Sequence, residues 1–412
     1  MNEIRTIEHD ASPAVTVPFK IDVSRGTTRT DVNKQWASRP DDEKYLSLDA
    51  IYEATNRRRI AALEAVIRPD QMKVRGSQEN PRDLSVLMPD GQAFAPSHFA
   101  VGQLAQLGGA GAAAGFIRRQ PSWLAAANLQ FALTVNRDTP TKVYADMDSG
   151  LLRAATGPDY GRIFDASLVG AVQKFAGNGT GDTRWKVPGM IDWRTMHYNP
   201  HVAIDTQTTT LYASDRDVFL FLVDDTNPFE IGKLPNGDPD LVFRGFYCWN
   251  SEVGTRSLGI ATFFLRGVCQ NRCIWGTENF SELKIIHSKG GANRFAYEAE
   301  PALQRYAASE PTSMLAGIRT CKEAKIGFED DNDRLKFLSA KDLGLGGINL
   351  AEQVMATFER EEGGRIETVW DAAMGITAVA RTIPNQDKRI DMEKVAAKLM
   401  DRATRGRKLI DA

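Results

Sequence analysis

Hydrophobic and polar positions change their spacing along the chain, and the changes divide it into three parts. Residues 1–46 are polar with little periodicity, so we expect an extended N-terminal arm there. Residues 47–300 mix segments of period two with helical segments, and residues 301–412 have mainly helical spacing. The pattern predicts an α+β fold: a central, mainly antiparallel sheet backed by helices, followed by a helical C-terminal region.

Several helices can be located from their spacing and their start signals. Ser47 is a suitable N-cap for a helix that continues to Pro69, and Ser97 is a suitable N-cap for one that ends near Leu107. The segments "SWLAAANLQFAL" and "DASLVGAVQKF" also have helical spacing. The side chains expected to pack the first of these are Trp123, Leu124, Leu129 and Leu133.

Strands are predicted between these helices. "MKVRG" and "LSVLM" have strand spacing, and "KVYAD" and "LLRAAT" form a predicted hairpin around "MDSG". "DVFLFLV" is apolar on both faces, which is typical of a central strand covered on both sides. A second hairpin is predicted from Val242–Trp249 and Arg256–Leu265, joined by "NSEVGT", with at least one aromatic row packed against a helix.

Composition limits the class of protein. A chain of 412 residues with 42% hydrophobic and 25% charged residues can bury a sizeable core. The N-terminus lacks the apolar core of a signal peptide, and runs such as "GIATFFL" are shorter than the roughly 20 residues that span a bilayer. With four cysteines, which we take to be reduced thiols, we expect a cytoplasmic protein with no membrane contact, metal or cofactor.

The overall charge of −2 argues against a protein that coats duplex DNA nonspecifically, because such a protein is basic throughout. The charge is, however, unevenly distributed along the chain. Residues 215–240 contain seven acidic and two basic residues, and residues 244–294 contain seven basic and three acidic ones. Cations interleaved with flat side chains are what single-stranded nucleic-acid binding requires. The predicted contacts are Arg244, Phe246, Trp249, Arg256, Arg266, Arg272, Lys284, His287, Lys289 and Arg294, and Phe295 is one of the interleaved rings. A sheet with an aromatic core and arginines at its rim has the same pattern.

A second basic cluster, Arg57 to Arg59, lies in the first predicted helix. Such a cluster is most often a solvated helix face, and contact with phosphate or with an acidic partner is the alternative.

The segments "RGFYCWNSEVGTRSLGIATFFLRGVCQN", "IIHSKG", "FAPSHFAVGQLAQLG", "LLRAATGPDYGRIFDASLVGAV" and "TVWDAAMGITAVA" resemble a large family of phage- and plasmid-borne proteins whose shared domain has no assigned function. The resemblance covers roughly residues 70 to 385 and implies a mobile-element origin without implying a reaction. Its signature positions here are Asn250, Ser251, Glu252, Gly254, Arg266, Cys269, Asn271 and His287.

Three functions are consistent with these observations. The first is an oligomeric protein that binds or anneals single-stranded DNA in replication or recombination. The second is a counter-defence or host-protein-binding factor that uses the acidic stretch to imitate a phosphate backbone. The third is an enzyme, with Cys269, His287 and Glu252 as a catalytic set or a magnesium ion on Asp224, Asp225 and Glu230, but neither set has diagnostic spacing, so we expect no catalytic residues. A structural ion pair between Arg266 and Glu252 is an alternative to phosphate binding.

Overall fold

The computed structural model describes residues 41–135, 139–181, 183–192, 197–198, 201, 203–206, 208–234, 236–267, 272–273, 282–309, 312–383 and 386–410. Contacts divide the chain into two units, one with Ala61–Pro158 and the other with Asp159–Ala412 and the segment that ends at Ile60. Most of the predicted N-terminal arm lies outside the described residues. Its last residues form a short helical turn, Asp41–Glu43, and strand β1, Lys44–Tyr45. The predicted boundaries at residues 46 and 300 stay a prediction.

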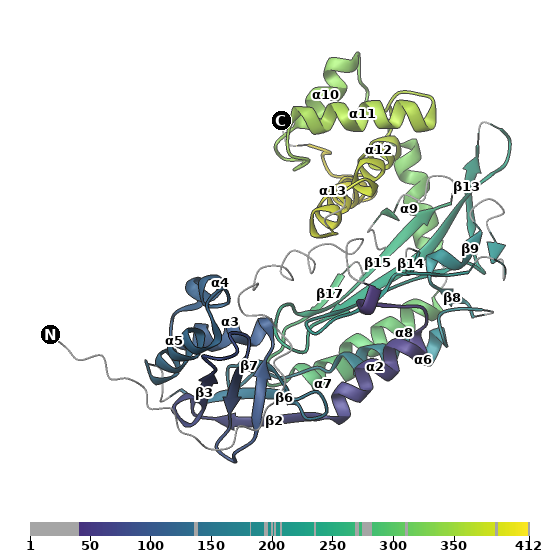
Figure 1. Ribbon diagram of the computed structural model, residues 1–412. Helices are drawn as coiled ribbons and strands as arrows, with labels where there is room; N and C mark the ends of the chain where they lie inside the picture. Colours follow the sequence, from purple (N-terminus) through teal and green to yellow (C-terminus); the bar gives the residue numbers. More distant parts are fainter. Residues whose placement is uncertain are drawn as a thin grey trace. The chain divides into compact units, whose positions relative to one another are not determined.

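The first unit is a six-stranded sheet packed against helices (Figure 1). Its strand order is β2-β6-β7-β5-β4-β3, antiparallel except for the pairing of β5 with β7. The strands are β2 (Ala62–Ile67), β3 (Lys73–Gly76), β4 (Leu84–Leu87), β5 (Ala93–Pro96), β6 (Thr141–Asp146) and β7 (Leu151–Thr156). The helices are α3 (His98–Leu107), α4 (Ala114–Ile117) and α5 (Ser122–Val135). Ser97 caps α3 as predicted, because its side chain accepts a hydrogen bond from the Ala100 amide.

One helix prediction is wrong at its end. Helix α2 (Leu48–Ile60) begins after Ser47 as predicted, but it does not continue to Pro69, because residues 62–67 form strand β2. In this strand the more exposed Glu64 and Val66 alternate with less exposed neighbours, which is the period of a half-buried strand.

The second unit contains a nine-stranded antiparallel sheet. Its main order is β1-β11-β12-β14-β15-β16, with β13 paired to β14, β17 paired to β15 and β8 paired to β12. The strands after β1 are β8 (Trp185–Lys186), β11 (Leu211–Ala213), β12 (Val218–Asp224), β13 (Phe229–Lys233), β14 (Pro239–Asn250), β15 (Leu258–Arg266), β16 (Arg272–Cys273) and β17 (Glu282–Ile285). Strands β9 (Ile191–Asp192) and β10 (His197–Tyr198) form a separate pair. The predicted central strand and second hairpin are confirmed as β12, which is buried throughout, and β14–β15.

A layer of helices covers one face of this sheet, at the bottom of Figure 1. It consists of α2, α6 (Asp165–Ala176), α7 (Gly291–Arg294), the π-helical turn η6 (Phe295–Ala299) and α8 (Glu300–Ala308). The core beneath it contains Phe246 of β14, whose ring lies 5.6 Å from that of Phe175 in α6. One aromatic row of the hairpin therefore packs against helices, as predicted. The opposite row, with Tyr247 and Trp249, belongs to a separate buried cluster.

The C-terminal region is helical, as predicted. Its helices are α9 (Thr312–Glu323), α10 (Asp331–Ser339), α11 (Ile348–Glu362), α12 (Val369–Arg381) and α13 (Gln386–Thr404). They share a core with the sheet, in which Trp370 of α12 stacks on Phe264 of β15 with 5.6 Å between ring centroids. Among the described helices, none combines the length and the apolar composition that a bilayer crossing requires.

Candidate functional site

The turn between β14 and β15 is buried against the segment that leads into α6. Asn250, Ser251 and Glu252 are fully buried, and Gly254 completes the turn with a φ of 95°, a backbone conformation that favours glycine. Asn250 donates hydrogen bonds of 2.8 Å to the carbonyl of Ile163 and to the Asp165 carboxylate. The turn is thus fixed to a segment more than 80 residues earlier in the chain.

Glu252 supplies the negative group at the start of helix α6. The N-cap position of α6 is Phe164, which has no side-chain acceptor. Instead, a Glu252 carboxylate oxygen accepts from the Asp165 amide at 3.1 Å. A carboxylate at a helix N-terminus satisfies an amide and interacts favourably with the helix dipole. Glu252 therefore stabilises α6 from a distant part of the sequence.

His287 joins the same network from the segment after β17. Its Nδ1 accepts from the Ile163 amide at 3.4 Å, and its ring stacks on Tyr160 with 5.1 Å between centroids. Burial lowers the pKa of His287 to about 4, so the ring is neutral at pH 7 and Nε2 carries the proton. Gly161 is required nearby, because a Cβ there would lie 1.8 Å from the Ser288 carbonyl oxygen.

The structure therefore brings together five of the eight signature positions: Asn250, Ser251, Glu252, Gly254 and His287. They meet residues 160–165, which belong to another segment quoted for the resemblance. The side chains in this cluster are buried and hydrogen-bonded to backbone, an arrangement suited to holding the turn and the helix together. Cys269 lies outside the described residues, and so does Asn271.

Arg244, a predicted phosphate contact, is 1% exposed. Its guanidinium lies 3.3 Å from the Asp224 carboxylate and donates to backbone carbonyls at the C-terminal end of α8, including that of Ala307 at 3.3 Å. A cation at this end of a helix interacts favourably with the helix dipole. The prediction that Arg244 binds phosphate is wrong for this structure, because its hydrogen-bonding capacity is used inside the fold.

Two further arginines of the hairpin are also paired with carboxylates. Arg266 makes a two-pronged contact of 2.8 and 2.9 Å with Asp240 and a 2.6 Å contact with Glu362, so Glu252 is not its partner. Arg256 lies 3.4 Å from Asp217. Since an unpaired buried charge is costly, acidic and basic groups of neighbouring strands pair. The adjacent acidic and basic stretches thus partly neutralise each other within the sheet.

The acidic stretch gives neither a magnesium site nor an extended acidic face. Asp224 contacts Arg184 and Arg244, and Asp225 contacts Lys186 at 2.5 Å. Burial raises the pKa of Asp225, and the contact with Lys186 opposes the rise. Four of the seven acidic residues are buried, namely Asp217, Asp224, Asp225 and Asp240. In the described part of the chain, no three His, Cys, Asp or Glu side chains converge as metal ligands.

The predicted stacking residues of the hairpin are in the core. Phe246 is fully buried, and Trp249 is 8% exposed and stacks on Tyr247 with 5.2 Å between centroids. Neither ring is available to a base, so their assignment as contacts is corrected. Arg272 is placed in β16, but its side chain lies outside the described part. Of the remaining predicted cations, Lys284, Lys289 and Arg294 are exposed, whereas His287 is buried.

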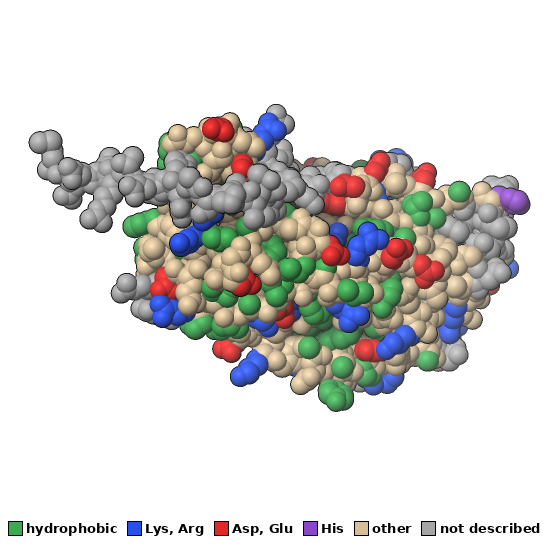
Figure 2. All heavy atoms as spheres, turned by 60° about the horizontal axis from the view of Figure 1, so that its bottom comes forward, with side chains coloured by type: hydrophobic (Ala, Val, Ile, Leu, Met, Phe, Trp, Pro, Cys, Tyr) green, Lys and Arg blue, Asp and Glu red, His purple; other side chains and the backbone are tan. Residues whose placement is uncertain are grey.

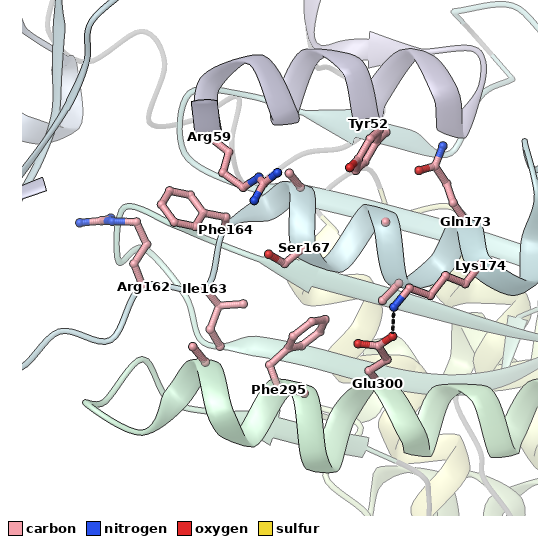
Figure 3. Close-up of a pocket in the computed structure, with 15 residues that line it drawn as sticks. Tyr52, Arg59, Arg162, Ile163, Phe164, Ser167, Gln173, Lys174, Phe295 and Glu300 are labelled. Carbon is pink, nitrogen blue, oxygen red and sulfur yellow. Dashed lines mark hydrogen bonds and ion pairs between the residues drawn. The ribbon is translucent and has the colours of Figure 1, made fainter. Parts of the chain in front are cut away.

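An open pocket of about 810 Å³ lies on the helix layer, across α6 and between α2 and the segment from α7 to α8. We call it the helix groove. Figure 3 shows Tyr52 and Arg59 on the α2 side, Ser167 on α6, and Phe295 and Glu300 on the third side. The residues that line it are Tyr52, Arg59, Arg162, Ile163, Phe164, Ala166, Ser167, Gly170, Ala171, Gln173, Lys174, Ala292, Phe295, Ala296 and Glu300.

The helix groove combines cations with aromatic rings. Arg59 donates to the amide oxygen of Asn56 at 2.9 and 3.0 Å, a neutral acceptor that leaves its charge uncompensated there. Lys174 pairs with Glu300, and Arg162 donates to the Glu252 carbonyl. Its lining also contains the partly exposed rings of Tyr52 and Phe164, and that of Phe295, which is 6% exposed and belongs to the core. Elsewhere on the face seen in Figure 2, basic and acidic side chains are interspersed rather than gathered by sign.

Further exposed side chains follow in residues 289–297, where Lys289, Arg294 and Tyr297 (81%) are exposed. Arg294 pairs with Glu298 at 2.8 Å on the surface. Arg294, Tyr297 and the helix groove share the segment from α7 to η6. Lys284 is also exposed, but in β17 its neighbours Leu283 and Ile285 face the core beneath the helix layer, so Lys284 faces the other side of the sheet.

Part of this surface is predictable from the sequence. The Arg57–Arg59 cluster is an alternative phosphate contact and Phe295 an interleaved ring in the sequence-based prediction, and the structure places Arg59 and Phe295 in the groove. Arg57 instead pairs with Glu53, and Arg58 donates to the Ser214 carbonyl. The groove residues missed were Tyr52, Arg162, Phe164 and Lys174, for which the sequence offered no signal beyond helical spacing.

Comparison with protein-family models, with curated proteins and with solved structures finds no match. The family resemblance described above stays a prediction.

Proposed function

We propose that this protein binds single-stranded nucleic acid, and that it does so in the helix groove and along residues 289–297 rather than on the β14–β15 hairpin. The observation that carries the proposal is that one open groove brings the uncompensated charge of Arg59 together with the partly exposed rings of Tyr52 and Phe164. Cations follow the phosphate backbone, and rings stack on bases with about 1–3 kcal/mol each.

The size of the groove fits this role. Its volume of about 810 Å³ is in the range of roughly 300–1,000 Å³ that is typical of ligand-binding clefts. Gly170 on α6 lets the Tyr52 ring pack closely against this helix, because a Cβ there would lie 3.1 Å from the ring. Beyond the groove, Tyr297 offers an exposed ring next to Arg294.

The proposal includes a role in replication or recombination of a mobile element and a cytoplasmic location, both of which rest on the resemblance and the composition. The alternative, a host-protein-binding factor with an acidic face, receives less support, because four of the seven acidic side chains that would form this face are buried.

Fluorescence anisotropy with a labelled deoxythymidine oligonucleotide tests the proposal. With about three phosphates neutralised, log K should fall with log salt at a slope of about −2 between about 50 and 200 mM. Arg59→Ala should weaken binding and reduce the slope by about 0.7. The matched control is Arg360→Ala, an exposed arginine on α11 (68% exposed), which should leave both values unchanged.

Absence of binding at the lowest salt concentration would refute the proposal. Equal losses in the Arg59 and Arg360 variants would refute the assignment of the groove, because they would indicate contact with charge in general.

A further inference from the structure

Helix α5 of the first unit has no charged residue along its whole length, Ser122–Val135. One face packs in the core through Ala125, Leu129 and Leu133. The opposite face is also apolar, because Trp123 is 44% exposed, Phe131 70% and Val135 58%. Trp123 was expected to pack the core and instead points outward. A helix face in contact with water normally carries charged or polar residues.

We propose that this exposed face of α5 binds the same face of a second copy of the chain, so that the protein forms a two-fold symmetric dimer. The first argument is the area. With about 200 Å² for a fully exposed aromatic side chain, the exposed parts of Trp123, Phe131, Val135 and the neighbouring Phe116 of α4 (65% exposed) add up to roughly 400–450 Å². One side of a standard-size protein interface buries about 800 Å², and about 65% of a homodimer interface is apolar. The apolar area on α5 is close to what a dimer with an interface of this standard size requires.

The second argument is the order of side chains along the face. Trp123, Ala127, Phe131 and Val135 follow each other at intervals of four residues and form one ridge of the helix. In an antiparallel pair of α5 helices, Trp123 lies opposite Val135 of the other copy, and Ala127 lies opposite Phe131. Each large side chain thus meets a smaller one, as a self-complementary interface requires.

The absence of charge on α5 argues against two other occupants. A nucleic acid would require lysine or arginine on the contact surface, and an interfacial membrane helix is typically rich in lysine and arginine on its polar face. Helix α5 carries neither residue. An uncharged apolar face is best matched by another uncharged apolar face, which the second copy supplies.

Light scattering coupled to size exclusion tests this on the full chain. The wild type should have twice the chain mass of 45.5 kDa, and Phe131→Glu should return it to the mass of one chain. The matched control, Ile348→Glu on α11 (53% exposed), should remain dimeric. Both variants replace exposed side chains, so their circular dichroism spectra should match that of the wild type.

A wild type with the mass of one chain, or a Phe131→Glu variant that remains dimeric, would overturn the proposal. A mixed complex formed only with another protein would also overturn it, because the face would then serve a different partner. Phe131→Glu should bind a short oligonucleotide at the helix groove with unchanged intrinsic affinity per chain, so the dimer and the nucleic-acid proposal can fail separately.

Discussion

Two cationic regions of the second unit differ in what their charges contact. In the β14–β15 hairpin, Arg244 and Arg266 are 1% and 5% exposed and are bonded to aspartates of the same sheet. In the helix groove, Arg59 is exposed and bonded to a neutral amide. The hairpin is richer in arginine and aromatic residues, but its arginines pair with carboxylates and stabilise the fold. In the groove, the Arg59 guanidinium is exposed to solvent, and its hydrogen bonds to Asn56 involve no carboxylate.

The difference shows that a net charge counted along a segment does not locate a binding surface. Acidic residues 215–240 and basic residues 244–294 lie on neighbouring strands, so opposite charges partly cancel between strands. Exposed cations of the second unit include Arg59 at the end of α2 and Lys289 and Arg294 after the sheet.

The largest effect is expected for Arg244→Leu. Its removal leaves the buried Asp224 without one of its cations and the end of α8 without its donor. Breaking a buried pair costs about 3–5 kcal/mol, so the urea midpoint should fall strongly. Arg244→Leu combined with Asp224→Asn should recover part of the loss. A change below about 1 kcal/mol would show that the hairpin pair is as dispensable as a surface pair.

The next effect concerns His287 and pH. The pKa of His287 is about 4 in the folded protein and about 6.5 in an unfolded chain. Between pH 6.5 and 4 the unfolded chain therefore binds a proton that the folded protein does not, and stability falls as the pH falls through this window. The neighbouring charged groups are Arg162 and Glu252.

His287→Gln should reduce this pH dependence, by roughly 2–3 kcal/mol over the whole window. Thermal unfolding from pH 7 to pH 4 measures it. Parallel curves for the variant and the wild type would contradict a buried neutral histidine.

Arg256→Gln separates the two regions directly. Asp217, which is 1% exposed, loses a partner, so unfolding should become easier by about 1–2 kcal/mol. Oligonucleotide affinity should remain within about twofold, because Arg256 is not among the residues that line the helix groove. Arg59→Ala should show the reverse, with weaker binding and unchanged stability. If Arg256→Gln and Arg59→Ala weaken oligonucleotide binding equally, the result would contradict the assignment of binding to the groove and not to the hairpin.

Glu252→Gln tests the contact between the turn and α6. The amide keeps the shape and an acceptor but removes the negative charge at the helix N-terminus. We expect a loss of about 1 kcal/mol in urea unfolding. Asp49→Asn, at the exposed start of α2, is the control and should cost only a few tenths of that amount.

The smallest effect on stability is expected for Arg294→Ala. Its pair with Glu298 lies on the surface, so the unfolding midpoint should not change measurably. Affinity for the oligonucleotide should fall about twofold to threefold, since one cation of the contact surface is lost. A variant with reduced stability and full affinity would show that Arg294 stabilises the fold, as the hairpin arginines do, and does not contact the oligonucleotide.

Much of the fold could be predicted because it depends on local periodicity. The hairpins, α6, the central strand β12 and the C-terminal helices follow from spacing alone. Strand β2 was missed because Ala62, Leu63 and Glu64 are good helix formers that directly follow α2, and their pairing with β6 is not visible in the local sequence.

The site was harder to predict, because each side chain's role depends on a partner distant in the sequence. Arg244 acquires its role from α8, more than 60 residues later. Tyr52 and Phe295 line the same groove from opposite sides of α6 although more than 200 residues separate them. Composition could identify residue types that suit a nucleic-acid surface but not which elements expose them.

The bond between Glu252 and the Asp165 amide joins groups 87 residues apart. Contacts between distant parts of a chain form slowly, because the intervening segment must first be brought together at an entropic cost. Helix α6 therefore acquires its terminal anchor only after the β14–β15 turn has assembled. During synthesis on the ribosome, the groove would be complete only once the chain as far as Glu300 had emerged, because Glu300 is part of its lining.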